Sequence, residues 1–191
     1  MRDFLYSEIA NFHGIPNIPE DPDLAVHVAE QICENLLEPL QDTFGRLAIR
    51  SAYRSKEVNG FGNAQQKAKK KGYNCASNEA NYAHHIWDER DADGYLGGTV
   101  CLVVPTFAKL YEDGMSWTAL AWWIHDNLPY NSQYFFPKRA ALNLNWHENP
   151  KSKIQSYVSP KGTLTQHGME NHSGDHSSEY QEMLARIGVA Q

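Results

Sequence analysis

The sequence is poor in cysteine: Cys33, Cys75 and Cys101 are the only three, and they lie far apart along the chain. An odd number of scattered cysteines does not make a disulfide framework, so we expect reduced thiols and a cytoplasmic protein. The chain also lacks any run of the roughly 18 consecutive apolar residues that a membrane span requires. Residues 1–8 contain no apolar core of a signal peptide. We therefore expect neither a membrane span nor secretion through a signal peptide.

Positive charge is scarce as well. The net charge is -6, and the basic run at residues 67–71 is short and lies next to Gly72. Nucleic-acid binding depends on clustered lysine and arginine, so nucleic acid is not an expected partner. Gly60 and Gly62 lack the preceding strand and the lysine of a phosphate-binding loop. No serine or cysteine lies in a nucleophile elbow, so the chemistry is expected elsewhere.

The sequence contains enough apolar material for one packed core. Of its 191 residues, 41% are hydrophobic, and this length is typical of one domain of roughly 100 to 200 residues. We expect a single domain over residues 1–191, with an N-terminal arm over residues 1–20, where prolines interrupt any helix. The core is expected over residues 24–160. The tail over residues 161–191, rich in Gly, Ser and His, should pack loosely and end in a short helix near residues 180–187.

The strongest periodic signal is a stripe of apolar residues at spacing four, from Leu24 to Leu40. It follows an Asp-Pro pair suited to a cap and a first turn, and it predicts an amphipathic helix that ends near Gly45. Other apolar segments predict helices and strands along the rest of the core. The mixture predicts an α+β fold with a small antiparallel sheet flanked by helices. A further helix is expected at residues 55–70, and residues 107–111 and 117–124 are expected to be helical or mixed apolar segments. The expected strands are residues 46–52, 99–104 and 140–147.

Side chains that can bind a metal are concentrated in residues 84–93, which hold two histidines and three aspartates. Imidazole and carboxylate groups together suit zinc or iron. An Asp- and Gly-rich surface turn is the alternative interpretation. The ligand candidates in this segment are His84, His85, Asp88, Asp91 and Asp93.

Other ligand-capable residues lie on a predicted strand and at a predicted helix end. On a strand, Asn145 and His147 point to the same face, so they are able to supply a hydrogen-bond donor and a ligand to one site. His125 and Asp126 follow two tryptophans, and this pair either assists catalysis as an acid or base or caps an aromatic helix. The histidines of the tail are expected to be solvated.

Residues 51–55 read Ser-Ala-Tyr-Arg-Ser after a predicted helix, and residues 146–147 read Trp-His. Over roughly residues 24–150 the chain thereby resembles the zinc D-alanyl-D-alanine carboxypeptidase superfamily, which includes Hedgehog and phage endolysin domains. The resemblance implies a Hedgehog-like fold and a bound zinc ion. It also implies that His147 is a zinc ligand and that Arg54 contacts the substrate or stabilises charge near the metal.

The other zinc ligands depend on how the second motif of the superfamily is aligned. With His84 as the first ligand, Asp91 stands at the expected seventh following position. The motif is instead aligned on the strand predicted at residues 99–104 in the second alternative. Cys101 then takes the position of the aspartate ligand, and residues 86–96 become an insertion. His85 then pairs with a carboxylate of that insertion, and we favour this alignment. It gives a metal shell of His85, Asp88 and His147, with His84, Asp91, Asp93 and Cys101 as alternatives.

The positions that hold the catalytic base in the superfamily are Leu144 and Asn145 here. Neither side chain takes a proton from water at neutral pH, so other residues must assist the metal. The catalytic candidates are Arg54, His125 and Asp126. The substrate-binding candidates are Ser51, Asn59, Trp87, Asn145 and Trp146.

The resemblance implies a metal-dependent hydrolase that cleaves a peptide or amide bond in a small peptide or a peptidoglycan-type substrate. Without a signal peptide, such an enzyme is expected to be a cytoplasmic dipeptidase or a phage-encoded protein released at lysis. Two alternatives stay open. One is a non-haem iron or other small-molecule metalloenzyme on the same fold, because two histidines and one carboxylate suit iron. The other is a metal-binding module without catalytic activity, which the missing base position favours.

Overall fold

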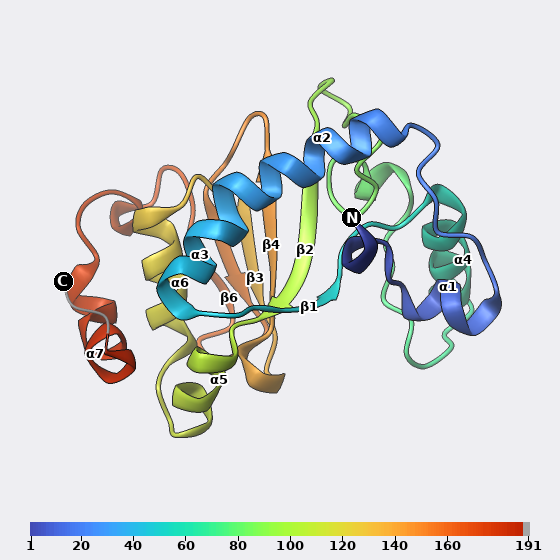
Figure 1. Ribbon diagram of the computed structural model, residues 1–191. Helices are drawn as coiled ribbons and strands as arrows, with labels where there is room; N and C mark the ends of the chain where they lie inside the picture. The colour runs from blue at the N-terminus through green and yellow to red at the C-terminus, as the bar shows by residue number, and fades with distance from the viewer. Residues whose placement is uncertain (189–191) are drawn as a thin grey trace.

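The computed structural model describes residues 1–188, which form a six-stranded sheet flanked by helices (Figure 1). The strands are β1 (Ala48–Ser51), β2 (Gly97–Val103), β3 (Ser132–Phe135), β4 (Leu142–His147), β5 (Lys153–Ser156) and β6 (Gly162–Thr165). Their order across the sheet is β1-β2-β4-β3-β5-β6. Neighbouring strands are antiparallel, except that β3 and β5 are parallel. The α+β class is confirmed, whereas the sheet is larger than expected and mixed.

The long helix expected after Asp21 is present, with a π-helical turn inside it. It consists of α2 (Pro22–Ile32), the π turn η2 (Cys33–Leu37) and α3 (Glu38–Phe44). The Asp21 carboxylate accepts the Leu24 N–H at 3.0 Å, which caps the first turn as the sequence predicted. The helix packs across the sheet, where α2 contacts β2 and β4 (Figure 1). The residues at spacing four that fill the core are Val28, Ile32, Leu36 and Leu40.

The other helices lie around the sheet. They are α1 (Glu8–His13), α4 (Lys56–Lys67), α5 (Pro105–Glu112), α6 (Trp117–Asn127) and α7 (Ser177–Ile187), with short 3-10 turns η1 (Arg2–Leu5), η3 (Glu79–Asn81), η4 (Lys138–Ala140) and η5 (Glu170–His172). In Figure 1, α1 and α4 lie beyond the end of the sheet at β1, and α6 and α7 lie at the opposite side. The helix expected at residues 55–70 corresponds to α4, and the apolar segments at residues 107–111 and 117–124 are helical, as α5 and α6.

Both ends of the described chain pack more tightly than the sequence suggested. In the tail, α7 lies against α6 and buries Tyr180, Met183 and Leu184 in the main core. These residues share one face of a helix, so docking that face removes apolar surface from water. In the arm, Phe4 is buried, and its ring centroid lies 5.5 Å from that of Trp87. The tail is therefore docked rather than loosely packed, and the arm contains helical turns.

No helix within residues 1–188 is long and apolar enough to cross a membrane.

Candidate metal centre

His85, a favoured metal ligand, is buried inside the domain. Only 8% of the residue is exposed, and its Nδ1–H donates to the Ala52 carbonyl at 2.8 Å. Burial, together with the nearby Arg54 charge, lowers the pKa of His85 well below its ordinary value. The ring is therefore neutral at pH 7, and it holds the loop to the segment that follows β1.

Asp88, the second favoured ligand, ties this loop to the N-terminal arm. Its Oδ2 accepts the Tyr53 hydroxyl at 3.1 Å and the Glu20 N–H at 2.7 Å. The expected shell of His85, Asp88 and His147 is not assembled, because these three side chains do not bring their ligand atoms within 4.8 Å of one another in the described chain. The buried contacts of His85 and Asp88 direct both side chains inward.

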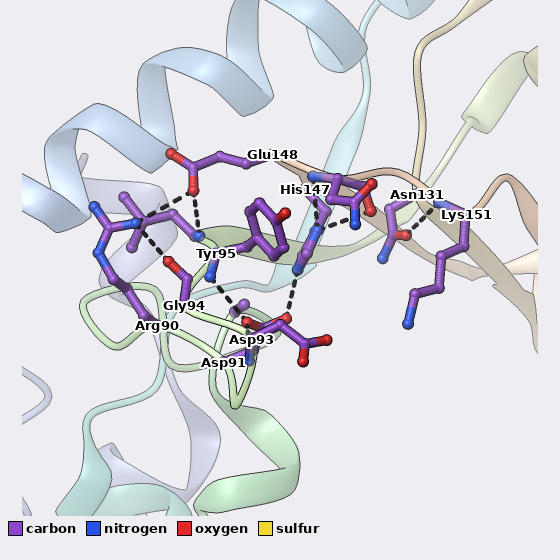
Figure 2. A network of polar contacts seen from close by, with 12 residues as sticks. Arg90, Asp91, Asp93, Gly94, Tyr95, Asn131, His147, Glu148 and Lys151 are labelled. Atoms are coloured by element: carbon purple, nitrogen blue, oxygen red, sulfur yellow. Dashed lines mark hydrogen bonds and ion pairs between the residues drawn. The ribbon is translucent and has the colours of Figure 1, made fainter.

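His147 instead meets Asp91, one of the alternative ligands (Figure 2). The His147 Nε2 and the Asp91 Oδ2 lie 3.0 Å apart, although the two residues are 56 positions apart in the sequence. The other Asp91 oxygen, Oδ1, accepts the N–H groups of Asp93 and Tyr95 at 3.0 and 2.9 Å. Partial burial alone would raise the pKa of Asp91, but these hydrogen bonds and the His147 contact hold it below its ordinary value. We refer to these two residues as the Asp91–His147 pair.

The two central strands place this pair at their ends. His147 is the last residue of β4 and lies opposite Gly97, the first residue of β2. A Cβ atom on Gly97 would lie 2.7 Å from the His147 ring and 2.5 Å from the Ala83 carbonyl oxygen. The absence of a side chain at residue 97 therefore allows the His147 ring to approach the backbone that carries His84.

His84 and His85 are adjacent in the loop but differ in burial. The residue before it, Ala83, has a φ of 56°, in the left-handed region that residues with a side chain rarely adopt. The Asn145 amide donates to the Ala83 carbonyl at 3.2 Å and holds this conformation. The His84 side chain is exposed, while His85 points into the domain. Loss of water around the ring and the nearby His147 lower the pKa of His84.

The backbone of Asn149 orients His147 in either neutral form of the ring. The His147 Nδ1 lies 3.0 Å from the Asn149 nitrogen and 3.1 Å from its oxygen. When Nδ1 accepts the N–H, the ring proton lies on Nε2, which donates to Asp91. When Nδ1–H donates to the carbonyl, Nε2 carries a free lone pair, which is the form that binds a metal.

Charged side chains surround the pair. Glu148 follows His147 but turns away from it, and its Oε2 accepts the Leu96 N–H at 2.7 Å and an Arg90 N–H at 3.3 Å. Figure 2 shows Lys151 next to Asn131 and the Asp93 carboxylate next to Asp91. The charge of Lys151 also contributes, less than burial and His147, to the lowered pKa of His84.

Arg54, the expected substrate contact, lies in another environment. Its Nη1 donates to the Cys75 sulfur at 2.8 Å, and its backbone N–H donates to the His85 carbonyl. Its Nε is buried without a partner, and burial lowers the pKa of this guanidinium. Within residues 1–188, no hydrogen bond or ion pair joins Arg54 to the Asp91–His147 pair.

Several expected substrate contacts are structural residues. Trp87 is fully buried in the core. The Asn59 amide donates to the Ala76 carbonyl and to Asn78, and the Asn145 amide donates to Ala83 and Thr99. These hydrogen bonds hold the amide nitrogens of both side chains inside the domain, while the Asn59 Oδ1 is buried without a partner. On the sheet, Ser51 pairs with Cys101, whose pKa is raised by burial, and the half-buried Trp146 lies beside His27.

His125 and Asp126 belong to a separate cluster at the end of α6. Ligand atoms of His125, Asp126 and His176 all lie within 4.8 Å of one another, the only such group of three within residues 1–188. His176 belongs to the tail, whose Gly, Ser and His content predicts solvated histidines. The four-residue spacing of His172 and His176 was the available signal.

The geometry of these two clusters is the main evidence on function. Comparison with known proteins gives no family model, curated protein or solved structure that matches this chain.

Proposed function

We propose that the protein is a metal-dependent hydrolase whose metal ion is bound by His84, Asp91 and His147. The observation that carries the proposal is the Asp91–His147 pair, in which two ligand atoms from distant segments lie 3.0 Å apart. Each side chain is oriented through its second polar atom, as metal-binding histidines and carboxylates usually are. The ligand atoms of His84, Asp91 and His147 are not all within 4.8 Å of one another, so the His84 ring must turn toward the pair to complete a set of two imidazoles and one carboxylate.

The donor set fits zinc. Bonds of about 2.0 to 2.2 Å place two ligand atoms of a tetrahedral zinc ion roughly 3.3 Å apart. The atoms of the pair already lie near that spacing, and the exposed His84 ring is free to turn toward them. Three protein ligands leave the fourth position to water, which is the arrangement of catalytic rather than structural zinc.

The surrounding residues supply the groups that hydrolysis requires. A bound zinc ion lowers the pKa of water and polarises a carbonyl group. Asp93 is exposed and follows Asp91 by two residues, so its carboxylate replaces the base that is missing at Leu144 and Asn145. Lys151, exposed beside the pair, binds a carboxylate of the substrate in place of Arg54. A short peptide with a free carboxyl end, such as a D-alanyl-D-alanine peptide, suits this arrangement.

The first test is the metal content and activity of matched variants. His147→Ala and Asp91→Asn should each lose one zinc ion per chain, whereas His27→Gln, at an exposed histidine of α2, should not. Both variants should also lose hydrolysis of D-alanyl-D-alanine peptides. In the wild type, a chelator should abolish this activity and added zinc should restore it. Asp93→Asn should keep the metal and lower the rate by about 10²- to 10⁴-fold, the usual contribution of a general base.

Wild-type zinc content in both His147→Ala and Asp91→Asn would contradict the proposal. The same donor set also suits non-haem iron, which is the second candidate. Iron in the purified protein, together with oxygen consumption that depends on His147, would favour that candidate. A metal that depends on His147 but supports no turnover would indicate a binding module.

A further inference from the structure

A second cluster of metal-capable side chains lies where the tail meets α6. His125 and Asp126 belong to the last turn of α6, His172 lies in η5, and His176 directly precedes α7. The ligand atoms of His125, Asp126 and His176 are within 4.8 Å of one another. We refer to these three residues with His172 as the tail cluster, which shares no residue with the Asp91–His147 pair.

The His176 ring lies between two acceptor oxygens. Its Nε2 lies 3.1 Å from the Asn171 carbonyl oxygen, and its Nδ1 lies 2.7 Å from the Asp126 Oδ1. A neutral imidazole carries one N–H, so it donates to one of these oxygens and turns a lone pair toward the other. With the proton on Nε2, the Nδ1 lone pair and the Asp126 carboxylate face the same point, where a metal ion would bind both.

The side chains of the cluster are oriented in the way that metal ligands are. The Asp126 Oδ2 accepts the His176 N–H at 3.0 Å and the Tyr180 hydroxyl at 3.2 Å, so Oδ1 is the oxygen left for a ligand. The His176 ring stacks on Trp122, with centroids 4.1 Å apart and planes 8° apart. The His125 Nδ1 lies 2.6 Å from the Tyr130 hydroxyl and its Nε2 lies 2.9 Å from the His172 carbonyl oxygen, so a bound ion would replace one of these two contacts. Such outer contacts fix coordinating rings and carboxylates in place.

A second observation points to a missing ligand partner. The His172 Nε2 is buried without a hydrogen-bond partner, although its ring centroid lies 5.1 Å from that of His125. A buried polar atom without a partner is costly, and a bound ion or water is one of its common explanations. A hollow of about 420 Å³ adjoins the cluster, lined by residues that include His125, Asp126 and Tyr180. The cluster is therefore accessible to an ion from solvent.

We propose that the tail cluster binds a divalent transition-metal ion that fastens the tail to α6. Imidazole and carboxylate donors favour zinc, cobalt or nickel over calcium and magnesium, which prefer oxygen ligands. The C-terminal end of a helix carries partial negative charge, and this also favours a cation at α6. Two ligands come from α6 and one or two from the tail, so the ion cross-links segments about 50 residues apart in sequence.

The test uses the His147→Ala chain, in which the Asp91–His147 pair no longer contributes. Cobalt(II) titration of this chain should give one ion per chain and the visible absorption of a site with nitrogen and oxygen ligands. Adding His176→Ala or Asp126→Asn should weaken cobalt binding by at least about tenfold, the lower end of the effect of losing a supporting contact. Adding His27→Gln, at an exposed histidine of α2 outside the cluster, should change nothing. Circular dichroism of each variant verifies folding.

Proteolysis of the tail gives a second measurement. Zinc should slow cleavage within residues 166–176 of the His147→Ala chain and should have no such effect once His176→Ala is added. The proposal is overturned by the absence of saturable cobalt binding, or by binding that both His176→Ala and Asp126→Asn leave unchanged. The contact would then be an ordinary hydrogen bond between the His176 ring and the Asp126 carboxylate. Because the other centre is disabled throughout, neither result bears on the proposed hydrolase.

Discussion

Replacement of Gly97 by alanine tests whether close backbone packing builds the candidate metal centre. The added Cβ would lie 2.5 Å from the Ala83 oxygen, 2.7 Å from the His147 ring and 2.9 Å from the Trp146 oxygen. Two of these three atoms belong to the backbone, so the clash is not relieved by rotation of a flexible side chain. The Ala83 contact falls about 0.9 Å short of the 3.4 Å at which ordinary van der Waals contact begins.

The expected cost of Gly97→Ala is about 2 kcal/mol of unfolding free energy, within the range of about 1 to 3 kcal/mol for overpacked sites. The substitution should also move His147 away from Asp91, because the ring is one of the contacted groups. Zinc content should therefore fall even at temperatures where the variant remains folded. Urea unfolding and elemental analysis of the folded protein measure the two effects separately.

Gly60→Ala is the matched control for this prediction. Gly60 lies within α4, and a Cβ there would meet only the Asn78 side chain, at an ordinary distance of 3.7 Å. Alanine is the better helix former, so this variant should gain about 0.5 to 1 kcal/mol. If Gly97→Ala matched the wild type in both stability and zinc content, the argument that residue 97 must lack a side chain would be refuted.

Three further predictions concern buried groups. The pKa of His85 is depressed in the folded state, so its contribution to stability is complete above about pH 6.5 and declines at lower pH, by at most about 1.4 kcal/mol per pH unit. His85→Gln should reduce that slope in urea unfolding at pH 5.5 to 7, and an unchanged slope would contradict this assignment. Asp88→Ala should lower the free energy of unfolding by about 3 kcal/mol, because the Tyr53 hydroxyl and the Glu20 N–H lose their shared acceptor. A loss below about 1 kcal/mol would show that water replaces these contacts. Met183→Ala should cost about 2 to 4 kcal/mol because this residue is fully buried, and a near-neutral thermal shift would mean that the tail is loosely packed after all.

The parts of the fold with a repeating pattern were predictable from the sequence. The stripe at spacing four gave the position of the helix that runs through α2 and α3. Its π turn was not predictable, because Leu36 and Leu40 keep the same spacing across the turn and remain buried. The strands β3, β5 and β6 were missed, since each has only four residues and two of them pair in parallel across a long connection. Segments this short carry little periodicity of their own.

The candidate centre depended on a side-chain direction that periodicity does not specify. His84 and His85 are adjacent, and the favoured alignment used the one that proves to be buried. The loop that contains them begins with Ala83, whose backbone is left-handed and whose carbonyl accepts a long-range hydrogen bond from Asn145. The pairing of Asp91 with His147 was available only as an alternative, through the seven-residue spacing from His84.

The tail was partly predictable. Its short helix was expected, and Tyr180, Met183, Leu184 and Ile187 follow a helical spacing that indicates one apolar face. The Gly, Ser and His content before that helix favours a loosely packed tail instead. Composition described the connecting segment correctly as polar, but it carried no information on where α7 docks.

The contacts of Asp88 have a consequence for local unfolding. Its carboxylate holds the N–H of Glu20, and the Asn17 side chain bonds both the Tyr53 carbonyl and the Ser55 N–H. The arm before α2 and the loop that carries His84 are therefore unable to open independently. Amide hydrogen exchange should show the two segments as one cooperative unit, with a shared opening free energy below that of the central strands. Any ligand that holds the loop closed would then protect the arm from exchange, although the ligand never touches it.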